Sequence, residues 1–291
     1  MRKISEDKIN NIRELRRGGL SLEKISKEMD LSRDTVTKYT KDIVLNKEEK
    51  YLMISKSLQK YNYNLSTFTD VSASTFYILG AFITDGHILY NEERHVYAAI
   101  LTSKDLDWLE SINALISPNK PIVKAKESKA YLLKIHNKKI ADWFIRHNCK
   151  PRKSLDVKFP NIPKEYLIDF IRGCMDGDGC FCIYKAKDKK NPQFYSYISS
   201  ASYSFIEEFQ SNLKRLGIKS TINKCNLVNS VIKGRAVIAK HNLFRLHFCR
   251  SETVKLIKTI YYKNCLCLVR KQNKCKEILQ LSDNESAMTI K

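Results

Sequence analysis

An imperfect internal repeat limits the possible folds more than any other feature of this sequence. Two apolar segments, FYILGAFITDGHI (76–88) and FIRGCMDGDGCF (170–181), each contain a glycine-containing, helix-forming stretch that ends in Asp-Gly. Strand-like stretches and an amphipathic helix follow each of them, because the hydrophobic period changes from that of a helix to that of a strand and back. The sequence therefore predicts two similar α+β halves in one chain.

The segments that follow the two apolar helices correspond in order. The predicted strands are 97–103 and 130–136 in the first half and 195–201 and 243–248 in the second; the predicted amphipathic helices are 104–116 and 202–216. The halves differ mainly around 219–240, where the second half is expected to contain an additional loop or strand.

The two apolar helices carry small residues at matching places. Gly173 and Gly177 are four positions apart and so lie on one helix face, and Gly80 and Thr84 take the equivalent places in the first helix. Small residues with this spacing let two helix backbones approach closely. We therefore expect the two helices to pack side by side and to end at the same place.

Two carboxylates would then meet at these helix ends. Asp85 and Asp178 each precede a terminal glycine, where the helix dipole disfavours negative charge by a few tenths to about 1 kcal/mol. Like charges this close repel unless a proton or a metal intervenes. Magnesium takes ligands from one or two carboxylates, phosphate oxygens and water. The pattern favours metal-dependent phosphodiester cleavage, in which divalent ions stabilise the attacking and leaving oxygens.

These residues resemble the LAGLIDADG homing endonucleases over about 75–280. The two motifs are ILGAFITDG (78–86) and IRGCMDGDG (171–179), and the flanking segments KPRKSLDVKFPNIP (150–163) and YYKNCLCLVRK (261–271) also fit. The family's metal-binding acid is the eighth motif position, which falls on Asp85 and Asp178. The sixth position is Asp176 in the second motif but Ile83 in the first, which suggests that Asp176 is structural.

The resemblance implies a fold and an activity. The expected fold class is α/β (α+β), with a pseudo-two-fold pair of αββαββα subdomains, 73–160 and 161–281, whose sheets form a saddle over DNA. The implied activity is a double-strand break, dependent on Mg²⁺ or another divalent cation such as Mn²⁺, made by a monomer in a long, non-palindromic target.

Four basic residues on the later strands are predicted to assist catalysis. They are Lys134 and His136 in the first half, and Arg245 and His247 in the second. Alternation along a strand turns these side chains away from the core, toward the presumed DNA side. Members of the family often have a basic residue near the metal. Plain contact with phosphate is an equally good interpretation of each residue.

The N-terminal segment 1–44 resembles a helix-turn-helix domain. Its third helix presents a basic face with four residues of interest: Arg33, Thr37, Lys38 and Lys41. The alternative is a small helical appendage with a solvated face. Residues 45–72 are predicted to be a linker, partly helical through 47–59, and 282–291 a disordered tail.

The charge balance indicates the class of partner. Lys and Arg total 52 against 31 acids, a net charge of +21, which favours binding to nucleic acid. No apolar run is long enough for a membrane span, and the first residues lack the apolar stretch of a signal peptide. The protein is therefore expected in the cytoplasm, associated with the nucleoid, with its nine cysteines reduced.

A non-cutting protein on the same scaffold is the alternative to an enzyme. It would be a DNA-binding regulator, or a maturase that binds intron RNA. Both motif acids are present, which favours the endonuclease. Neither a Walker loop nor a His-Glu-x-x-His motif occurs, and the Asp176-x-Asp178 pattern lacks the glycine and glutamate of an EF-hand.

Overall fold

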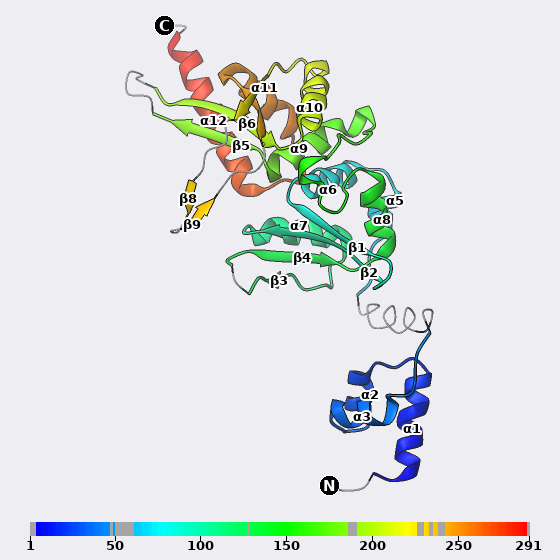
Figure 1. Cartoon of the computed structure of the whole chain (residues 1–291). Helices are drawn as coiled ribbons and strands as arrows, with labels where there is room; N and C mark the ends of the chain where they lie inside the picture. Colours follow the sequence, from blue (N-terminus) through cyan, green and yellow to red (C-terminus); the bar gives the residue numbers. More distant parts are fainter. Residues whose placement is uncertain are drawn as a thin grey trace. The chain divides into compact units, whose positions relative to one another are not determined.

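The computed structural model describes residues 4–46, 49, 61–126, 128–185, 191–225, 230–232, 235–237 and 242–289. The chain forms two compact units that divide after Asn62 (Figure 1). The first contains three short helices and the second contains two four-stranded sheets, so the fold is α+β with N-terminal helices. No helix among the described residues is long and apolar enough to cross a membrane.

The N-terminal unit is a three-helix cluster. Its helices are α1 (Glu6–Arg17), α2 (Leu22–Glu28) and α3 (Arg33–Thr40). Ser21 and Ser32 cap α2 and α3, because each side chain accepts a hydrogen bond from a first-turn backbone N–H. Ile12, Ile25 and Val36, one from each helix, form the fully buried centre of the unit.

The first half of the larger unit contains one sheet and its helices. Its elements are α5 (Ser66–Thr69), α6 (Ala73–Thr84), β1 (Gly86–Asn91), β2 (Val96–Ser103), α7 (Leu106–Ile116), β3 (Val123–Lys124), β4 (Tyr131–Ile135) and α8 (Lys138–Arg146). The strand order is β1-β2-β4-β3, and each described pair is antiparallel.

The second half repeats this arrangement. Its elements are the 3₁₀ turns η1 (Lys153–Leu155) and η2 (Lys164–Tyr166), α9 (Leu167–Gly177), β5 (Cys180–Tyr184), β6 (Gln193–Ser200), α10 (Tyr203–Arg215), β7 (Thr221–Cys225), β8 (Ser230–Ile232), β9 (Arg235–Val237), β10 (Leu243–Phe248), α11 (Arg250–Ile260) and α12 (Val269–Thr289). The strand order β5-β6-β10-β7 matches that of the first sheet element for element.

Among the described residues, helices pack on one face of each sheet. In the first half α7 and α8 pack on the sheet, and in the second α10 and α11 do so. Alternation along the strands directs Ile88, Leu101 and Leu133 to the covered face, where they are fully buried or nearly so. The opposite face of each sheet is called its open face below.

Three segments differ from the sequence predictions or extend them. The predicted linker ends in residues that belong to the core, because Phe68 is buried between Trp143 and Phe144. The segment expected at 219–240 includes β7 and the separate β8–β9 hairpin. Helix α12 continues to Thr289, so residues 282–289 are helical where a disordered tail was predicted; no proline or glycine occurs there to end the helix. The helix predicted within 47–59 lies almost wholly outside the described residues.

Candidate active site

Helices α6 and α9 touch backbone to backbone at their glycines. A Cβ atom on Gly80 would lie 2.8 Å from the backbone nitrogen of Cys174 and 3.0 Å from Cα of Gly173. A Cβ atom on Gly173 would lie 3.0 Å from the backbone nitrogen of Ala81. Because real Cβ atoms essentially never come closer, glycine is required at both positions. This contact sets the short distance between the backbones of the two helices.

The same contact continues to the helix ends. Gly177 faces Thr84, whose Cβ would lie 2.7 Å from a Cβ added to the glycine, and Oδ2 of Asp85 would lie 3.3 Å from it. The Thr84 hydroxyl donates back to the carbonyls of Gly80 and Ala81 in its own helix. The carboxylate of Asp85 therefore lies against the last turn of the partner helix.

Asp85 and Asp178 are the C-cap residues of α6 and α9. Burial, and then the charge of Asp178, raise the pKa of Asp85 to about 6 against the opposing effect of Lys271 and Lys153. Burial also raises the pKa of Asp178, again opposed by these two lysines. The two acids thus share one electrostatic environment, in which both negative charges are destabilised.

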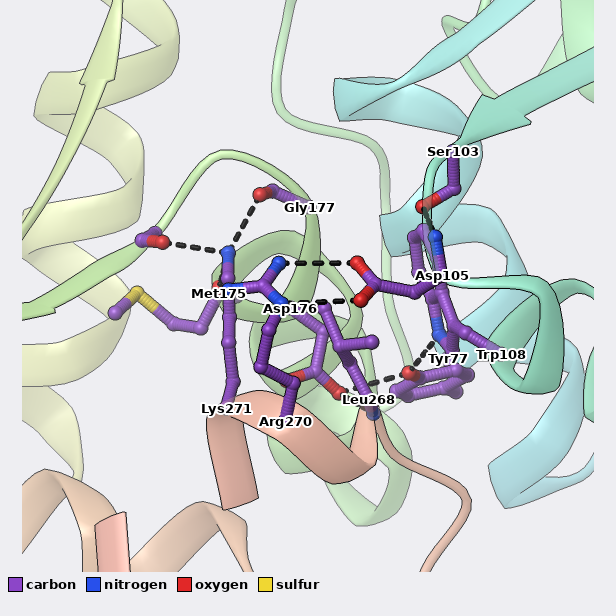
Figure 2. A network of polar contacts seen from close by, with 11 residues as sticks. Tyr77, Ser103, Asp105, Trp108, Met175, Asp176, Gly177, Leu268, Arg270 and Lys271 are labelled. Carbon is purple, nitrogen blue, oxygen red and sulfur yellow. Dashed lines mark hydrogen bonds and ion pairs between the residues drawn. The ribbon is translucent and has the colours of Figure 1, made fainter. Parts of the chain in front are cut away.

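Lys153 and Lys271 hold the ends of the two helices. The ammonium group of Lys153 is buried and donates to the carbonyl of Gly86, directly after α6. Lys271 donates to the carbonyls of Met175, Gly177 and Gly179 at 2.9, 2.6 and 2.5 Å, around the end of α9 (Figure 2). Each lysine therefore places a positive charge where the helix dipole and the acids are negative.

These two lysines are absent from the predicted site residues. The flanking segments 150–163 and 261–271 contain them, but periodicity assigns no role to a lysine in a loop or at the start of a helix. Burial of Lys271 lowers its pKa, while Asp176 and Asp85 raise it. Only one feature of the sequence pointed to these lysines. Each lies in a flanking segment that resembles the LAGLIDADG family outside the two motifs.

The segment before α12 brings Lys271 to the site. Leu268 donates its backbone N–H to Asp176 at 2.8 Å, and Arg172 donates to the carbonyls of Leu266 and Ile260. Arg270, next to Lys271, pairs with both carboxylate oxygens of Asp105 from the first half, each at 3.0 Å (Figure 2). The start of α12 is thus tied to both halves.

Asp176 is the centre of a buried hydrogen-bond network. Besides the N–H of Leu268, it accepts the hydroxyl groups of Tyr77 at 2.7 Å and Tyr261 at 2.5 Å. Trp108 in turn donates to the Tyr77 oxygen at 2.6 Å (Figure 2). Asp176 therefore joins α9 to α6 and to the segment before α12, while Ile83 at the matching motif position is buried and apolar.

The four predicted basic strand residues lie on β4 and β10 or directly after β4. These strands are separated from β1 and β5, which follow the acids, by a whole strand. Two strand spacings amount to about 10 Å. The charges that oppose the raised pKa of both acids come instead from Lys271 and Lys153.

The strand register also changes which of the four residues correspond. His87 pairs with Ile100 and Ile100 with Lys134, as Cys180 pairs with Tyr197 and Tyr197 with His247. Lys134 is therefore equivalent to His247, and Arg245 to Leu132. The order of the basic residue and the histidine along each strand therefore does not give the equivalent positions, because alternation within one strand does not set its register against the next.

Two cavities lie beside the helix ends. One, of about 320 Å³, is lined by Asp178, Lys153, Thr84 and Tyr197 among others. The second, of about 350 Å³, is lined by Gly179, Cys180, Phe181, Arg270, Lys271 and Lys274. Each cavity therefore contains one of the two helix-capping lysines.

The carboxylates at the helix ends suit a metal that is also held by its substrate. In the described part of the chain no three His, Cys, Asp or Glu side chains gather into a ligand set. The nearby carbonyls of Gly86, Gly177 and Gly179 already accept from lysines. Asp85 and Asp178 therefore provide the oxygen atoms that could bind a metal here. Mg²⁺ sites in proteins typically use only one or two carboxylates, with water and substrate phosphates as the other ligands.

The predicted DNA-contacting residues of the N-terminal unit lie on one helix. Arg33, Thr37 and Lys38 are exposed on α3, and Lys41 is its exposed C-cap. The nine cysteines are free thiols.

Comparison with known proteins finds a family model and several solved structures that are similar to parts of this chain. Residues 165–257 match the model of the LAGLIDADG-like domain. Solved structures with partial similarity include mesophilic variants of the homing endonuclease I-DmoI (20% identity, 66% of this chain and 91% of that chain, TM-score 0.44) and I-DmoI in complex with DNA and calcium (18%, 66% and 91%, 0.43). The meganuclease I-SmaMI bound to uncleavable DNA is also similar (13%, 72% and 91%, 0.47).

No curated protein sequence matches the chain at a significant level. The assignment rests on the domain match over residues 165–257 and on the two motif-bearing segments. Residues 165–257 of the chain are therefore assigned to the LAGLIDADG-like domain family.

Proposed function

We propose that this protein is a site-specific DNA endonuclease that breaks both strands by metal-dependent phosphodiester hydrolysis. The observation that carries the proposal is the pair Asp85 and Asp178, held at adjoining helix ends where both pKa values are raised. A protein tolerates such a pair when a cation or a ligand uses it.

Asp85 and Asp178 would hold the divalent cation, either Mg²⁺ or Mn²⁺. When bound, the cation supplies charge stabilisation at the attacking and leaving oxygens of the phosphodiester. These two carboxylates suit a cation because, among the described residues, no lysine or arginine is hydrogen-bonded to either of them. The neighbouring carbonyl groups already accept hydrogen bonds from Lys153 and Lys271.

Lys153 and Lys271 would keep the acids in working form. Their positive charges lower the pKa of both carboxyl groups, which favours the ionised state needed for cation binding. Their hydrogen bonds to the carbonyls after α6 and α9 hold the helix ends in place. A phosphodiester beside either cavity would also be close to one of these lysines.

The two open faces would bind the DNA on either side of the acids. The chain carries a net charge of +21, which suits the phosphate backbone. The two faces carry different side chains at equivalent positions, so each would read its own half of the target. A long, non-palindromic site bound by one monomer follows from this difference.

The N-terminal unit would add contacts outside the main site. Arg33, Thr37, Lys38 and Lys41 on or next to α3 provide a basic, exposed helix face of the kind that enters a groove. The divisions 1–44, 45–72, 73–160, 161–281 and 282–291 remain our proposed domain boundaries, modified by the core position of Phe68 and by the helical residues 282–289.

The test is cleavage of a diverse DNA library by the full chain, with Mg²⁺ or with EDTA. A discrete set of cut sequences that appears only with the metal is the expected result. Sequence-specific retention of DNA with no strand break in Mg²⁺ or Mn²⁺ would support the non-cutting regulator instead. Selective retention of RNA over DNA would support the maturase.

A further inference from the structure

The two open faces differ in chemistry at four equivalent positions, although Lys134 and His247 are both basic and Thr102 and Ser199 both carry a hydroxyl group. Superposing the strand registers pairs Ile100 with Tyr197, Ala98 with Tyr195, Leu132 with Arg245 and Val123 with Asn223. In each pair the first half has an aliphatic side chain, whereas the second has a polar or hydroxyl-bearing one.

The aliphatic residues on the open face of the first sheet lie outside the hydrophobic core. Ile100, Leu132, Leu89, Val96 and Val123 are absent from the cluster of core residues and from the side chains packed against it. Leu89, Val96 and Val123 are 38%, 39% and 46% exposed. These five residues occupy neighbouring register positions on the open face, with the buried Ala98 beneath them, and are called the aliphatic patch below.

Strand propensity explains only part of this patch. Valine and isoleucine favour strands. On a sheet with one face toward water, however, the side chains on that face are usually polar. The second sheet shows the usual pattern, since Leu243 is the one aliphatic side chain on the open face of its described strands β5, β6, β7 and β10. A contiguous apolar patch rimmed by polar groups indicates a binding surface.

The rim of the patch selects the partner. Lys134 lies on the same face. Burial, and then the positive charges of Lys120 and Lys134, lower the pKa of the nearby His136. Cations at the edge suit a phosphate backbone, while aliphatic side chains in the middle suit an apolar group on the bases. In the major groove of DNA that group is the C5-methyl of thymine.

We propose that the first sheet reads its half of the DNA target through the methyl groups of thymines, using the aliphatic patch. This inference rests on the proposed function and adds to it the sequence class of one half-site. The second sheet instead offers Arg245 and Asn223, which suit hydrogen bonds to guanine and adenine edges. The guanidinium of Arg245 lies 4.1 Å from the centre of the Tyr197 ring, which holds it on the open face.

Replacing thymine by deoxyuridine tests this directly, because the exchange removes the methyl group and leaves base pairing intact. The full chain in EDTA would first select binding sites from a random duplex library, so that no cleavage is needed. Affinity would then be measured with deoxyuridine in either half of the selected site. Each contacted methyl group should contribute about fourfold in affinity, so the reduction should be confined to one half.

Variants assign the sensitive half to the first sheet. Leu132→Arg introduces the residue of the equivalent position, and Arg245→Leu is the matched exchange in the second sheet. Leu132→Arg should abolish the deoxyuridine effect in the thymine-containing half and leave selection in the other half unchanged. Arg245→Leu should alter selection only in the other half.

Several results would overturn the inference. These are equal sensitivity of both halves to deoxyuridine, no sensitivity in either half, the absence of any selected DNA site, or tighter binding to RNA of the same sequence. The deoxyuridine measurement uses the unaltered protein, so it decides the question even where a variant fails to fold. A methyl-dependent site that is never cut in Mg²⁺ would uphold this inference and reject the endonuclease.

Discussion

Asp85 and Asp178 are unfavourably placed for stability, and that is what makes them informative. Burial and the helix dipole oppose both negative charges, and the charge of Asp178 also opposes that of Asp85. Lys153 and Lys271 offset this only in part. In the absence of metal, the protein should therefore gain stability when one charge is removed.

Asp85→Asn should stabilise the metal-free protein at neutral pH. The folded-state pKa of about 6 lies above the ordinary 3.8, so the folded protein binds more protons than the unfolded one between about pH 4 and 6. Stability should fall as the pH rises through this window, and the variant should escape that decrease, by roughly 1–3 kcal/mol at pH 8. Urea unfolding in EDTA at pH 4 and pH 8 measures the difference.

The exposed Asp156 provides the control. Asp156→Asn should change the free energy of unfolding only slightly, and by the same amount at pH 4 and at pH 8. If Asp85→Asn gains no more stability at pH 8 than at pH 4, the carboxyl group is not held at a raised pKa.

Lys271→Met should move the pH profile of DNA cleavage. Lys271 lowers the pKa of both acids, so without it more alkaline conditions are needed to ionise them. The acidic limb of the rate profile should shift to higher pH. Lys274→Met, next to the same cavity and paired with Glu277, should leave the limb in place. Equal profiles for the two variants would reject the role of Lys271.

The acids were predictable from the sequence and the lysines were not. Asp85 and Asp178 follow a glycine-containing apolar helix in a repeated context, which is a local signal. Lys271 reaches the end of α9 only because Asp176 binds Leu268 and because α12 begins directly afterwards. That placement depends on contacts between residues more than 90 positions apart, which no local pattern contains.

Helices α6 and α9 give the molecule its central contact. The spacing of Gly173 and Gly177 predicted that the helices would pack closely, and the structure places Gly80 opposite Gly173. The prediction succeeded because a glycine in the middle of a helix lowers stability. Its presence there therefore indicates a place where another backbone comes close.

Gly173→Leu should destabilise the larger unit by about 1–3 kcal/mol or more, because even its first carbon would meet the backbone of Tyr77 and Ala81. The melting temperature should fall accordingly. Gly18→Ala is a control, since a Cβ atom there has only ordinary contacts. An unchanged melting temperature for Gly173→Leu would show that α6 and α9 are farther apart.

The strands were located from the sequence but not aligned. Segments 97–103, 195–201 and 243–248 fall within a few residues of β2, β6 and β10. Their alternation shows which side chains share a face, yet it does not set the pairing of one strand against the next. For this reason Lys134 corresponds to His247 rather than to Arg245.

The chain combines a unit that contains the LAGLIDADG-like domain with a separate basic helical unit. Arg33→Ala with Lys38→Ala should weaken DNA binding and flatten the dependence of log affinity on log salt by about 0.9 for each phosphate that the protein no longer neutralises. Cleavage at high protein concentration should remain. Lys27→Ala, at a lysine paired with Glu23 on α2, is the control. An unchanged salt slope would favour a helical appendage that does not bind DNA.

The central claim is that one acid from each half serves a single site for cutting DNA. The most direct measurement compares double-strand cleavage and binding by the unaltered chain, Asp85→Asn and Asp178→Asn on the same selected DNA in Mg²⁺. Both variants should lose double-strand cleavage and retain binding, because binding rests on many phosphate contacts. Undiminished double-strand cleavage by either variant would contradict the account.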